Sequence, residues 1–219
     1  MGKIALVLGN GEPPSRELIN EIIGGDMLLL CADGGADTAR RYGLVPDYIV
    51  GDLDSVSRKS SAGVDPEHII RVAADNTGTD IEKVLRHAVA LGISEAVLLG
   101  FTGRRTDHLL WNLSVFKTFA EQIALRIVDE YCDLRLIGQR IRFRATIGQK
   151  ISLCPLNGPV EGITTTGLKF ALQNESLVPG LRDGISNEVV ADIVEIEVER
   201  GDLLLCVQRQ NNFRAIEPF

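Results

Sequence analysis

Short apolar runs alternate with helix-forming stretches along the first part of the chain, up to about Asp129. The runs are IALVLG, MLLLCA, DYIVG, HIIRVA, EAVLLG and ALRIVD. Parallel strands need a crossover connection, usually a helix, and they are apolar throughout when both faces of their sheet are covered. The alternation therefore predicts an α/β region built on a parallel sheet.

Two helices stand out between these runs. The clearer one extends from Thr79 to about Leu91, and Thr79 forms a capping box with Glu82 at its start. Its apolar residues form one stripe, Ile81, Val84, Leu85, Ala88 and Val89. The second helix begins at Thr106. We expect it to turn five residues toward the core, Leu109, Leu110, Leu113, Phe116 and Ala120.

The pattern changes at about residue 133, after which helical periodicity is absent. Short β-type runs follow one another, separated by glycine turns: DLRLIG, RIRFRATIG, KISLCPLNG, VEGITTTG, LKFALQ, NEVVADIVEIEVERG and LLLCVQ. Polar and apolar residues alternate from Arg140 to Arg144, as in a strand with one buried face. The sequence thus predicts two domains, an α/β domain at 1–132 and an antiparallel β domain, a sandwich or a barrel, at 133–219.

The composition excludes several classes of function. A formal charge of -7 and a pI near 5.1 are unlike the basic surface that a nucleic-acid partner needs. No apolar run approaches the roughly 20 residues that span a bilayer, so no membrane segment is expected. The four cysteines are Cys31, Cys132, Cys154 and Cys206, and none of them forms a CxxC pair. Such scattered cysteines favour buried free thiols in a reducing compartment, so we expect a cytoplasmic protein.

Chemically active residues gather after the predicted parallel strands. In an open α/β sheet the ligand binds at the carboxyl ends of the strands, where the connecting loops converge. Five successive strand ends carry glycines, acids or arginines: Gly9–Gly11, Asp33–Gly35, Asp52–Ser55, Asp75–Asp80 and Thr102–His108. These loops together predict one binding site.

The segment GDLDS places Asp52 and Asp54 two positions apart, so both carboxylates can reach one hard cation. An Asp-x-Asp sequence is also common in simple turns. Asp80, in the first turn of the capped helix, adds a third carboxylate. We therefore expect Asp52, Asp54 and Asp80 to bind a divalent metal, and interpret the chain as a metal-dependent enzyme that uses a nucleotide.

Arg105 and Asp107 flank the start of the second helix. Arg105 is placed to bind phosphate oxygens while Asp107 orients it or a metal-bound water, although a surface ion pair would give the same pattern. His108 is a candidate acid or base, or a structural hydrogen-bonding residue. No GxxxxGK[ST], GxGxxG, HExxH or GxSxG motif occurs, so carboxylates, metal and backbone amides would have to hold the nucleotide.

Five motifs occur in a distinctive order: ADGGAD (32–37), PDYIVGDLDS (46–55), TDIE (79–82), GFTGRRTDHLLWN (100–112) and ISNE (185–188). In this order and spacing they resemble the thiamine pyrophosphokinase family over essentially the whole chain. The resemblance implies a Rossmann-like α/β catalytic domain, a β-sandwich domain that binds thiamine, and a homodimer with active sites at the subunit interface.

The resemblance also implies an activity, that of an ATP-dependent diphosphotransferase. Such an enzyme transfers the pyrophosphoryl group of ATP to the hydroxyl of thiamine and releases AMP. The catalytic set would be Asp52, Asp54, Asp80, Arg105 and Asp107, with Mg²⁺ on the first three. The nucleotide would lie against Asp33, Gly34, Asn76, Thr79 and Arg105, and thiamine against Ser186 and Asn187. Either Asp80 or Asp54 would accept the hydroxyl proton.

The chain departs from the family pattern at two places. Arg104 stands where many members have a second glycine, and Asn76 with Thr77 stands where many bacterial relatives have a lysine and an acid. No late aromatic residue could be matched to thiamine stacking. Two alternatives remain open at this stage, a pyrophosphokinase for another hydroxymethyl compound such as a pterin, and a non-catalytic sensor of nucleotide or thiamine diphosphate.

Overall fold

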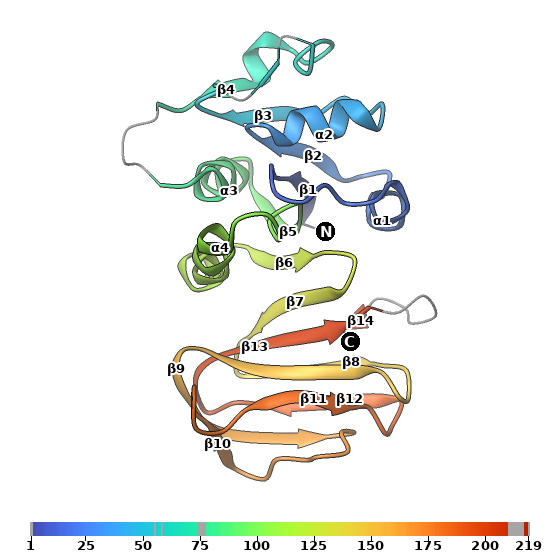
Figure 1. Ribbon diagram of the computed structural model, residues 1–219, viewed down its shortest axis with the longest axis vertical. Helices are drawn as coiled ribbons and strands as arrows, with labels where there is room; N and C mark the ends of the chain where they lie inside the picture. Colours follow the sequence, from blue (N-terminus) through green and yellow to red (C-terminus); the bar gives the residue numbers. More distant parts are fainter. Residues whose placement is uncertain (1, 55, 58, 74–77, 210–216, 219) are drawn as a thin grey trace. The chain divides into compact units, whose positions relative to one another are not determined.

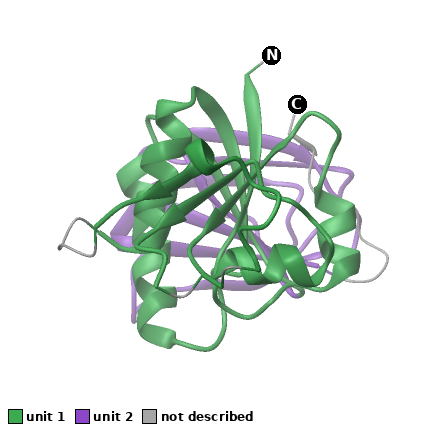
Figure 2. Ribbon diagram, turned by 90° about the horizontal axis from the view of Figure 1, so that it is seen from above, with its two compact units in different colours: residues 1–130 green, residues 131–219 purple. Residues whose placement is uncertain are grey.

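The computed structural model describes residues 2–54, 56–57, 59–73, 78–209 and 217–218. The chain divides into two compact units, Met1–Glu130 and Tyr131–Phe219, which Figure 2 shows in different colours. The division falls two residues before the one expected from the sequence, after residue 132.

The first unit contains a parallel sheet with the strand order β6-β5-β1-β2-β3-β4 (Figure 1). Its strands are β1 (Lys3–Leu8), β2 (Leu28–Ala32), β3 (Tyr48–Gly51), β4 (Ile69–Arg71), β5 (Ile93–Leu99) and β6 (Ala124–Val128). Each coincides with one of the apolar runs, so the predicted parallel α/β fold is confirmed. The order reverses at β1, which lies between β2 and β5.

Helices cover both faces of this sheet (Figure 1). They are α1 (Arg16–Ile22), α2 (Gly35–Arg41), α3 (Asp80–Ala90) and α4 (Thr106–Phe119), with a 3-10 turn, η1, at Pro66–His68. Leu18 and Ile19 of α1 pack with Leu6 and Leu8 of β1 in one apolar core. Val7 projects from the opposite side of β1 and is fully buried as well.

Helix α3 follows its prediction closely. The capping box between Thr79 and Glu82 is present, and four of the five stripe residues are buried: Ile81, Val84, Leu85 and Ala88. Helix α4 begins at Thr106 as expected, but its predicted inward face is partly wrong. Leu110 and Ala120 are exposed, and the buried residues are Asn112, Val115, Phe116 and Phe119.

The error in α4 has a physical cause. Apolar residues surround much of this helix, so periodicity alone leaves its rotation ambiguous. A polar group decides it instead, since the side-chain amide of Asn112 donates a 2.8 Å hydrogen bond to the Phe101 carbonyl. Asn112 is therefore drawn inward and Leu110 is turned outward.

The second unit is an antiparallel β-sandwich, as predicted. Its strands are β7 (Cys132–Ile137), β8 (Arg140–Arg144), β9 (Lys150–Thr166), β10 (Glu175–Leu177), β11 (Gly184–Glu188), β12 (Ile193–Glu197), β13 (Arg200–Gln208) and β14 (Glu217–Pro218). Strand β9 belongs to both sheets, because its first part pairs with β13 and its end pairs with β12. The inward side chains of both sheets form one apolar core, with Phe143 at 0% exposure.

Two expectations for this unit need correction. The runs KISLCPLNG and VEGITTTG form one continuous strand, β9, although Asn157 and Gly158 at the end of the first run have positive φ angles. The run LKFALQ is not a regular strand; it forms an isolated bridge between Leu168 and Val189 and further hydrogen bonds to β9 and β11. Across the described part of the chain, no helix combines the length and apolar character needed to cross a membrane.

Candidate active site

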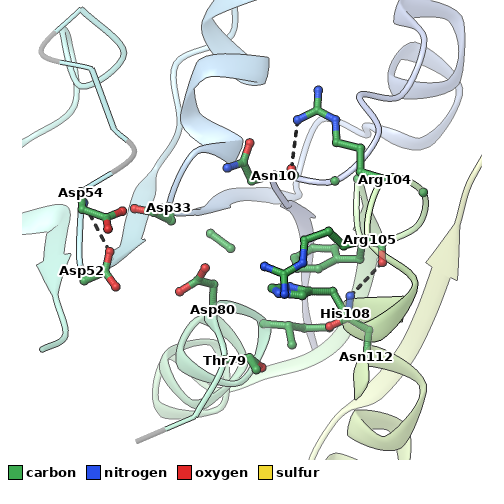
Figure 3. Close-up of a pocket in the computed structure, with 16 residues that line it drawn as sticks. Asn10, Asp33, Asp52, Asp54, Thr79, Asp80, Arg104, Arg105, His108 and Asn112 are labelled. Atoms are coloured by element: carbon green, nitrogen blue, oxygen red, sulfur yellow. Dashed lines mark hydrogen bonds between the residues drawn. The ribbon is translucent and has the colours of Figure 1, made fainter. Parts of the chain in front are cut away.

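A pocket of about 440 Å³ opens at the carboxyl ends of the parallel strands in the first unit. Its lining comes from the loops after β1, β2, β3 and β5 and from the starts of α3 and α4. This size lies within the range of ordinary small-molecule sites. Figure 3 shows that acidic side chains approach from one side and arginines from the other. We call these the acidic side (Asp33, Asp52, Asp54, Asp80) and the basic side (Arg104, Arg105).

Three aspartates of the acidic side form a tight group. One carboxylate oxygen each from Asp33, Asp52 and Asp54 lies within 4.8 Å of the others. Asp33 is only 4% exposed and has a φ of 44°, in the left-handed region. Its neighbour Gly51 permits this approach, because a Cβ there would lie 3.0 Å from the Cβ of Asp33. Oxygen donors this close fit a hard divalent cation such as Mg²⁺.

The Asp52–Asp54 turn is itself hydrogen bonded. The backbone N–H of Asp54 donates to Oδ1 of Asp52 at 3.3 Å, and Leu53 between them has a φ of 66°. This hydrogen bond, helped by the nearby charge of Lys83, lowers the pKa of Asp52. The turn and the cation site are thus compatible interpretations, since the turn aims both carboxylates at Asp33 (Figure 3).

Asp80 lies at the start of α3 and lines the pocket, but it lies outside that group of three among the described residues. Its Oδ1 accepts a 3.1 Å hydrogen bond from Nζ of Lys83, which also lies 3.5 Å from Oδ2 of Asp52. Lys83 is 7% exposed. Burial would lower the pKa of Lys83, but the two carboxylates raise it, so the ammonium stays charged.

Lys83 is a functional candidate that the sequence analysis missed. A signal was present, because a lysine three residues after Asp80 sits next to the apolar stripe that α3 turns to the core. A charged residue at such a position has to find a partner in the folded protein.

Thr79, a predicted nucleotide contact, lines the pocket and also caps α3. Its backbone N–H and its hydroxyl both donate to Oε2 of Glu82, at 2.9 and 3.0 Å. The same oxygen accepts a 3.2 Å hydrogen bond from the indole N–H of Trp111 on α4. Glu82 therefore ties the helix of the acidic side to the helix that follows the basic side.

The basic side is far more exposed. Arg105 donates from Nε and Nη2 to the two oxygens of Asp107, at 3.1 and 2.5 Å, and the side chains are 65% and 64% exposed. The hydrogen bonds lower the pKa of Asp107 to about 2 and raise that of Arg105. Arg104, with a φ of 53°, donates to the Asn10 carbonyl at 3.4 Å.

His108 and Asn112 also line the pocket from α4 (Figure 3). His108 is exposed, and Asn112 is held by its hydrogen bond to Phe101. Asn10, after β1, completes this part of the lining. The prediction did not assign Asn10 or Asn112 a role.

Several predicted site residues are not part of this lining. Gly34 caps α2 beside Asn10 without lining the pocket, and Asn76 lies outside the described residues. Asp107 accepts hydrogen bonds from Arg105 but does not itself line the pocket. Ser186 and Asn187 belong to the second unit.

In the second unit, Asn187 organises a loop around an exposed aromatic ring. Asn187 is buried, its Oδ1 accepts a 3.0 Å hydrogen bond from the backbone N–H of Phe170, and its Nδ2 donates to the Phe170 carbonyl at 2.8 Å. Phe170 is 64% exposed. Ser186 has a φ of 57°, and its backbone N–H donates to Oγ of Ser152. Phe170 is thus an exposed aromatic residue to which the sequence analysis gave no role.

The fold and the pocket define an α/β protein in which the ends of parallel strands bring a close group of carboxylates and two arginines to one pocket. Residues 19–128 match the family model "Thiamin pyrophosphokinase, catalytic domain", and residues 139–203 match "Thiamin pyrophosphokinase, vitamin B1 binding domain". The chain belongs to the thiamin pyrophosphokinase family.

Individual relatives agree with this assignment. The chain is 24% identical over 185 residues to thiamine pyrophosphokinase of Bacillus subtilis (strain 168), covering 81% of this chain and 86% of that protein. It is 27% identical over 215 residues to thiamine pyrophosphokinase 1 of Oryza sativa subsp. japonica, covering 84% and 80%. The crystal structure of the Bacillus subtilis enzyme superposes with a TM-score of 0.81 at 21% identity, over 95% of this chain and 100% of that one.

Proposed function

We propose that this protein is a thiamine pyrophosphokinase, which transfers the pyrophosphoryl group of ATP to the hydroxyl of thiamine and yields thiamine diphosphate and AMP. The observation that carries the proposal is the pocket of the first unit, where the group Asp33–Asp52–Asp54 faces Arg105. Phosphoryl-type transfer depends mainly on positioning and on cancelling negative charge, and this pocket offers both.

The acidic side divides into two roles. Asp33, Asp52 and Asp54 would hold Mg²⁺, which supplies charge neutralisation to the ATP phosphates when bound. Asp80 points into the same pocket (Figure 3), and its Oδ1 accepts a hydrogen bond from Lys83. A carboxylate that is not committed to a metal is the better proton acceptor, so Asp80 rather than Asp54 would take the proton of the thiamine hydroxyl. This division revises the metal set expected from the sequence, in which Asp80 was a ligand.

Arg105 would bind phosphate oxygens through its planar fork, the geometry in which it now binds Asp107. Asp107 holds the guanidinium in a fixed orientation until phosphate competes for it. Both side chains of this pair are largely exposed. Phosphate can therefore replace Asp107 as the partner of Arg105 without leaving an unpaired charge in a buried environment.

The acceptor would be recognised by the second unit. The exposed ring of Phe170 would provide a stacking surface for a cationic heteroaromatic ring. The buried amide of Asn187 fixes the backbone of Phe170 by hydrogen bonds to its N–H and its carbonyl. Ser186 would add a polar contact beside it. We also propose a cytoplasmic homodimer with its active sites at the subunit interface, supported by the family resemblance; sedimentation or size-exclusion chromatography with light scattering tests the dimer.

The activity is tested with purified protein, ATP, Mg²⁺ and thiamine. We expect AMP and thiamine diphosphate in equal amounts. Parallel reactions with a hydroxymethyl pterin test the other acceptor class, and ATP binding without AMP release would indicate a sensor. A folded protein that forms neither product under these conditions contradicts the proposal.

A further inference from the structure

Lys83 is placed behind the acidic side rather than inside the pocket. Its Nζ lies 3.1 Å from Oδ1 of Asp80 and 3.5 Å from Oδ2 of Asp52, and both of these aspartates line the pocket. Lys83 itself is not among the described lining residues. Its side chain therefore acts on ligands through the two carboxylates that it holds and through its fixed positive charge.

The position of this charge has two opposite electrostatic effects. The ammonium repels a divalent cation that enters the group of Asp33, Asp52 and Asp54, and it occupies oxygens of Asp52 and Asp80 that could otherwise turn toward that cation. The same charge attracts the phosphates of a nucleotide, which the four carboxylates of the acidic side would otherwise repel. One buried lysine thus weakens the binding of bare metal and strengthens the binding of the metal–nucleotide complex.

We propose that Lys83 is a positioning residue that couples the divalent cation to the nucleotide, so that the cation enters the pocket mainly together with a polyphosphate. This inference rests on the proposed function of the pocket. In thermodynamic terms, Lys83 increases the coupling free energy between the two ligands, and that coupling is reciprocal. The consequence is a site that stays largely free of metal until its nucleotide arrives.

The test compares Lys83→Met with wild type by direct binding, with Mn²⁺ as the probe ion and electron paramagnetic resonance as the readout. Methionine keeps an unbranched side chain of similar length and removes the charge. We expect bare Mn²⁺ to bind about three- to tenfold more tightly to the variant. In the presence of a non-hydrolysable ATP analogue, we expect the Mn²⁺–nucleotide complex to bind about tenfold more weakly.

A matched control lies one helical turn further along α3. Arg86→Met makes the same change of charge on an exposed side chain that pairs with Glu82 outside the pocket lining. Both binding constants of this variant should stay within about twofold of wild type, because its charge is screened by solvent. Lys83→Arg keeps the charge, and its bare Mn²⁺ affinity should also remain within about twofold.

Opposite shifts of the two affinities in Lys83→Met support the proposal. A merely structural role would weaken both, and a role without coupling would shift both in the same direction or neither; each of these results overturns it. Should Lys83→Met fail to fold by circular dichroism, Lys83→Gln removes the same charge while retaining a hydrogen-bond donor for the carboxylates. Since binding alone is measured, an enzyme that turns out inactive with thiamine would refute the proposed function and leave this test valid.

Discussion

The acidic and the basic sides of one pocket are built in different ways. Asp33 is buried, and Asp52 and Asp80 are held by Lys83, so the acidic side has its geometry before any ligand arrives. Arg105 reaches the pocket from an exposed loop, and its partner Asp107 is equally exposed. The first arrangement suits a cation that demands closely spaced oxygens, and the second suits phosphate groups that arrive attached to a larger ligand.

The difference shows what fixes the positions of the side chains on each side of the pocket. A group of like charges is costly to assemble. Here the carboxylates are held together by the ends of the strands, by the left-handed backbone conformation of Asp33 and by the buried ammonium of Lys83. An exposed ion pair contributes little to stability and is easily exchanged for another anion. Substitutions on the acidic side should therefore affect catalysis most, and those on the basic side should act through nucleotide binding.

The largest effect is expected for Asp54→Asn. The substitution removes one anionic oxygen from the group of three without changing its shape, and it should lower kcat by about 10³-fold, or roughly 4 kcal/mol in the barrier. Steady-state kinetics over a range of Mg²⁺ concentrations measures the loss. The control Asp26→Asn, on an exposed turn outside the pocket lining, should leave kcat unchanged. Equal losses in both variants would contradict the role of the acidic side.

A smaller loss is expected for Arg105→Gln. The guanidinium fork would be absent from the phosphate site, so kcat/KM for ATP should fall about 100-fold, or roughly 2.7 kcal/mol. Arg105→Lys keeps the charge but loses the two-pronged geometry and should recover only part of the activity. Thermal unfolding should change little, because the pair with Asp107 is exposed. A large fall in Tm with normal kinetics would mean that Arg105 is a structural residue.

The sequence was sufficient to predict where most of the acidic side lies in the fold. Apolar runs located all six parallel strands, and the rule that ligands bind at their carboxyl ends brought Asp33, Asp52, Asp54 and Asp80 to one edge. Sequence patterns could not show which three would share a cation, because that depends on the φ angle of Asp33 and on Lys83 reaching Asp80. Such contacts are three-dimensional and have no periodic signature.

The sequence was less informative where polar contacts decide the structure. The rotation of α4 follows from the Asn112 hydrogen bond rather than from its apolar residues. In the second unit the order of glycine turns predicted the sandwich, but the loop at Phe170 is shaped by the buried amide of Asn187. These side-chain to backbone hydrogen bonds join residues 11 and 17 positions apart and cannot be inferred from either residue alone.

Arg104→Gly should separate two properties of the basic side, the contribution of the Arg104 charge to nucleotide binding and the backbone strain at this residue. A non-glycine residue at a φ of 53° is strained, so glycine should raise stability by about 0.5–1 kcal/mol even after its greater freedom in the unfolded chain is counted. The same change removes a cation near the pocket, so KM for ATP should rise about two- to fivefold. Chemical denaturation and kinetics measure the two effects. A variant that is both less stable and fully active would show that Arg104 serves the fold.

The smallest effect on activity is expected for Glu82→Gln, which tests the link between the two sides. Glutamine can still accept from Thr79, but the charged hydrogen bonds to Trp111 and Thr79 become neutral ones. Stability at pH 7 should fall by about 1 kcal/mol, and kcat should change no more than about twofold. Glu17→Gln, in the first turn of α1, is the matched control.

The pH dependence of this loss has a definite sign. Partial burial would raise the pKa of Glu82, but hydrogen bonds from Thr79 and Trp111 outweigh it and lower the pKa below the usual range of a glutamate. A group whose pKa is lowered by folding stabilises the protein above its unfolded pKa and loses that contribution as the pH falls through its folded pKa. The stability difference between wild type and Glu82→Gln should therefore be constant from pH 7 to about 5 and should shrink below about pH 4. Denaturation at a series of pH values measures it, and a difference that grows on acidification would show that Glu82 is not held as an anion between α3 and α4.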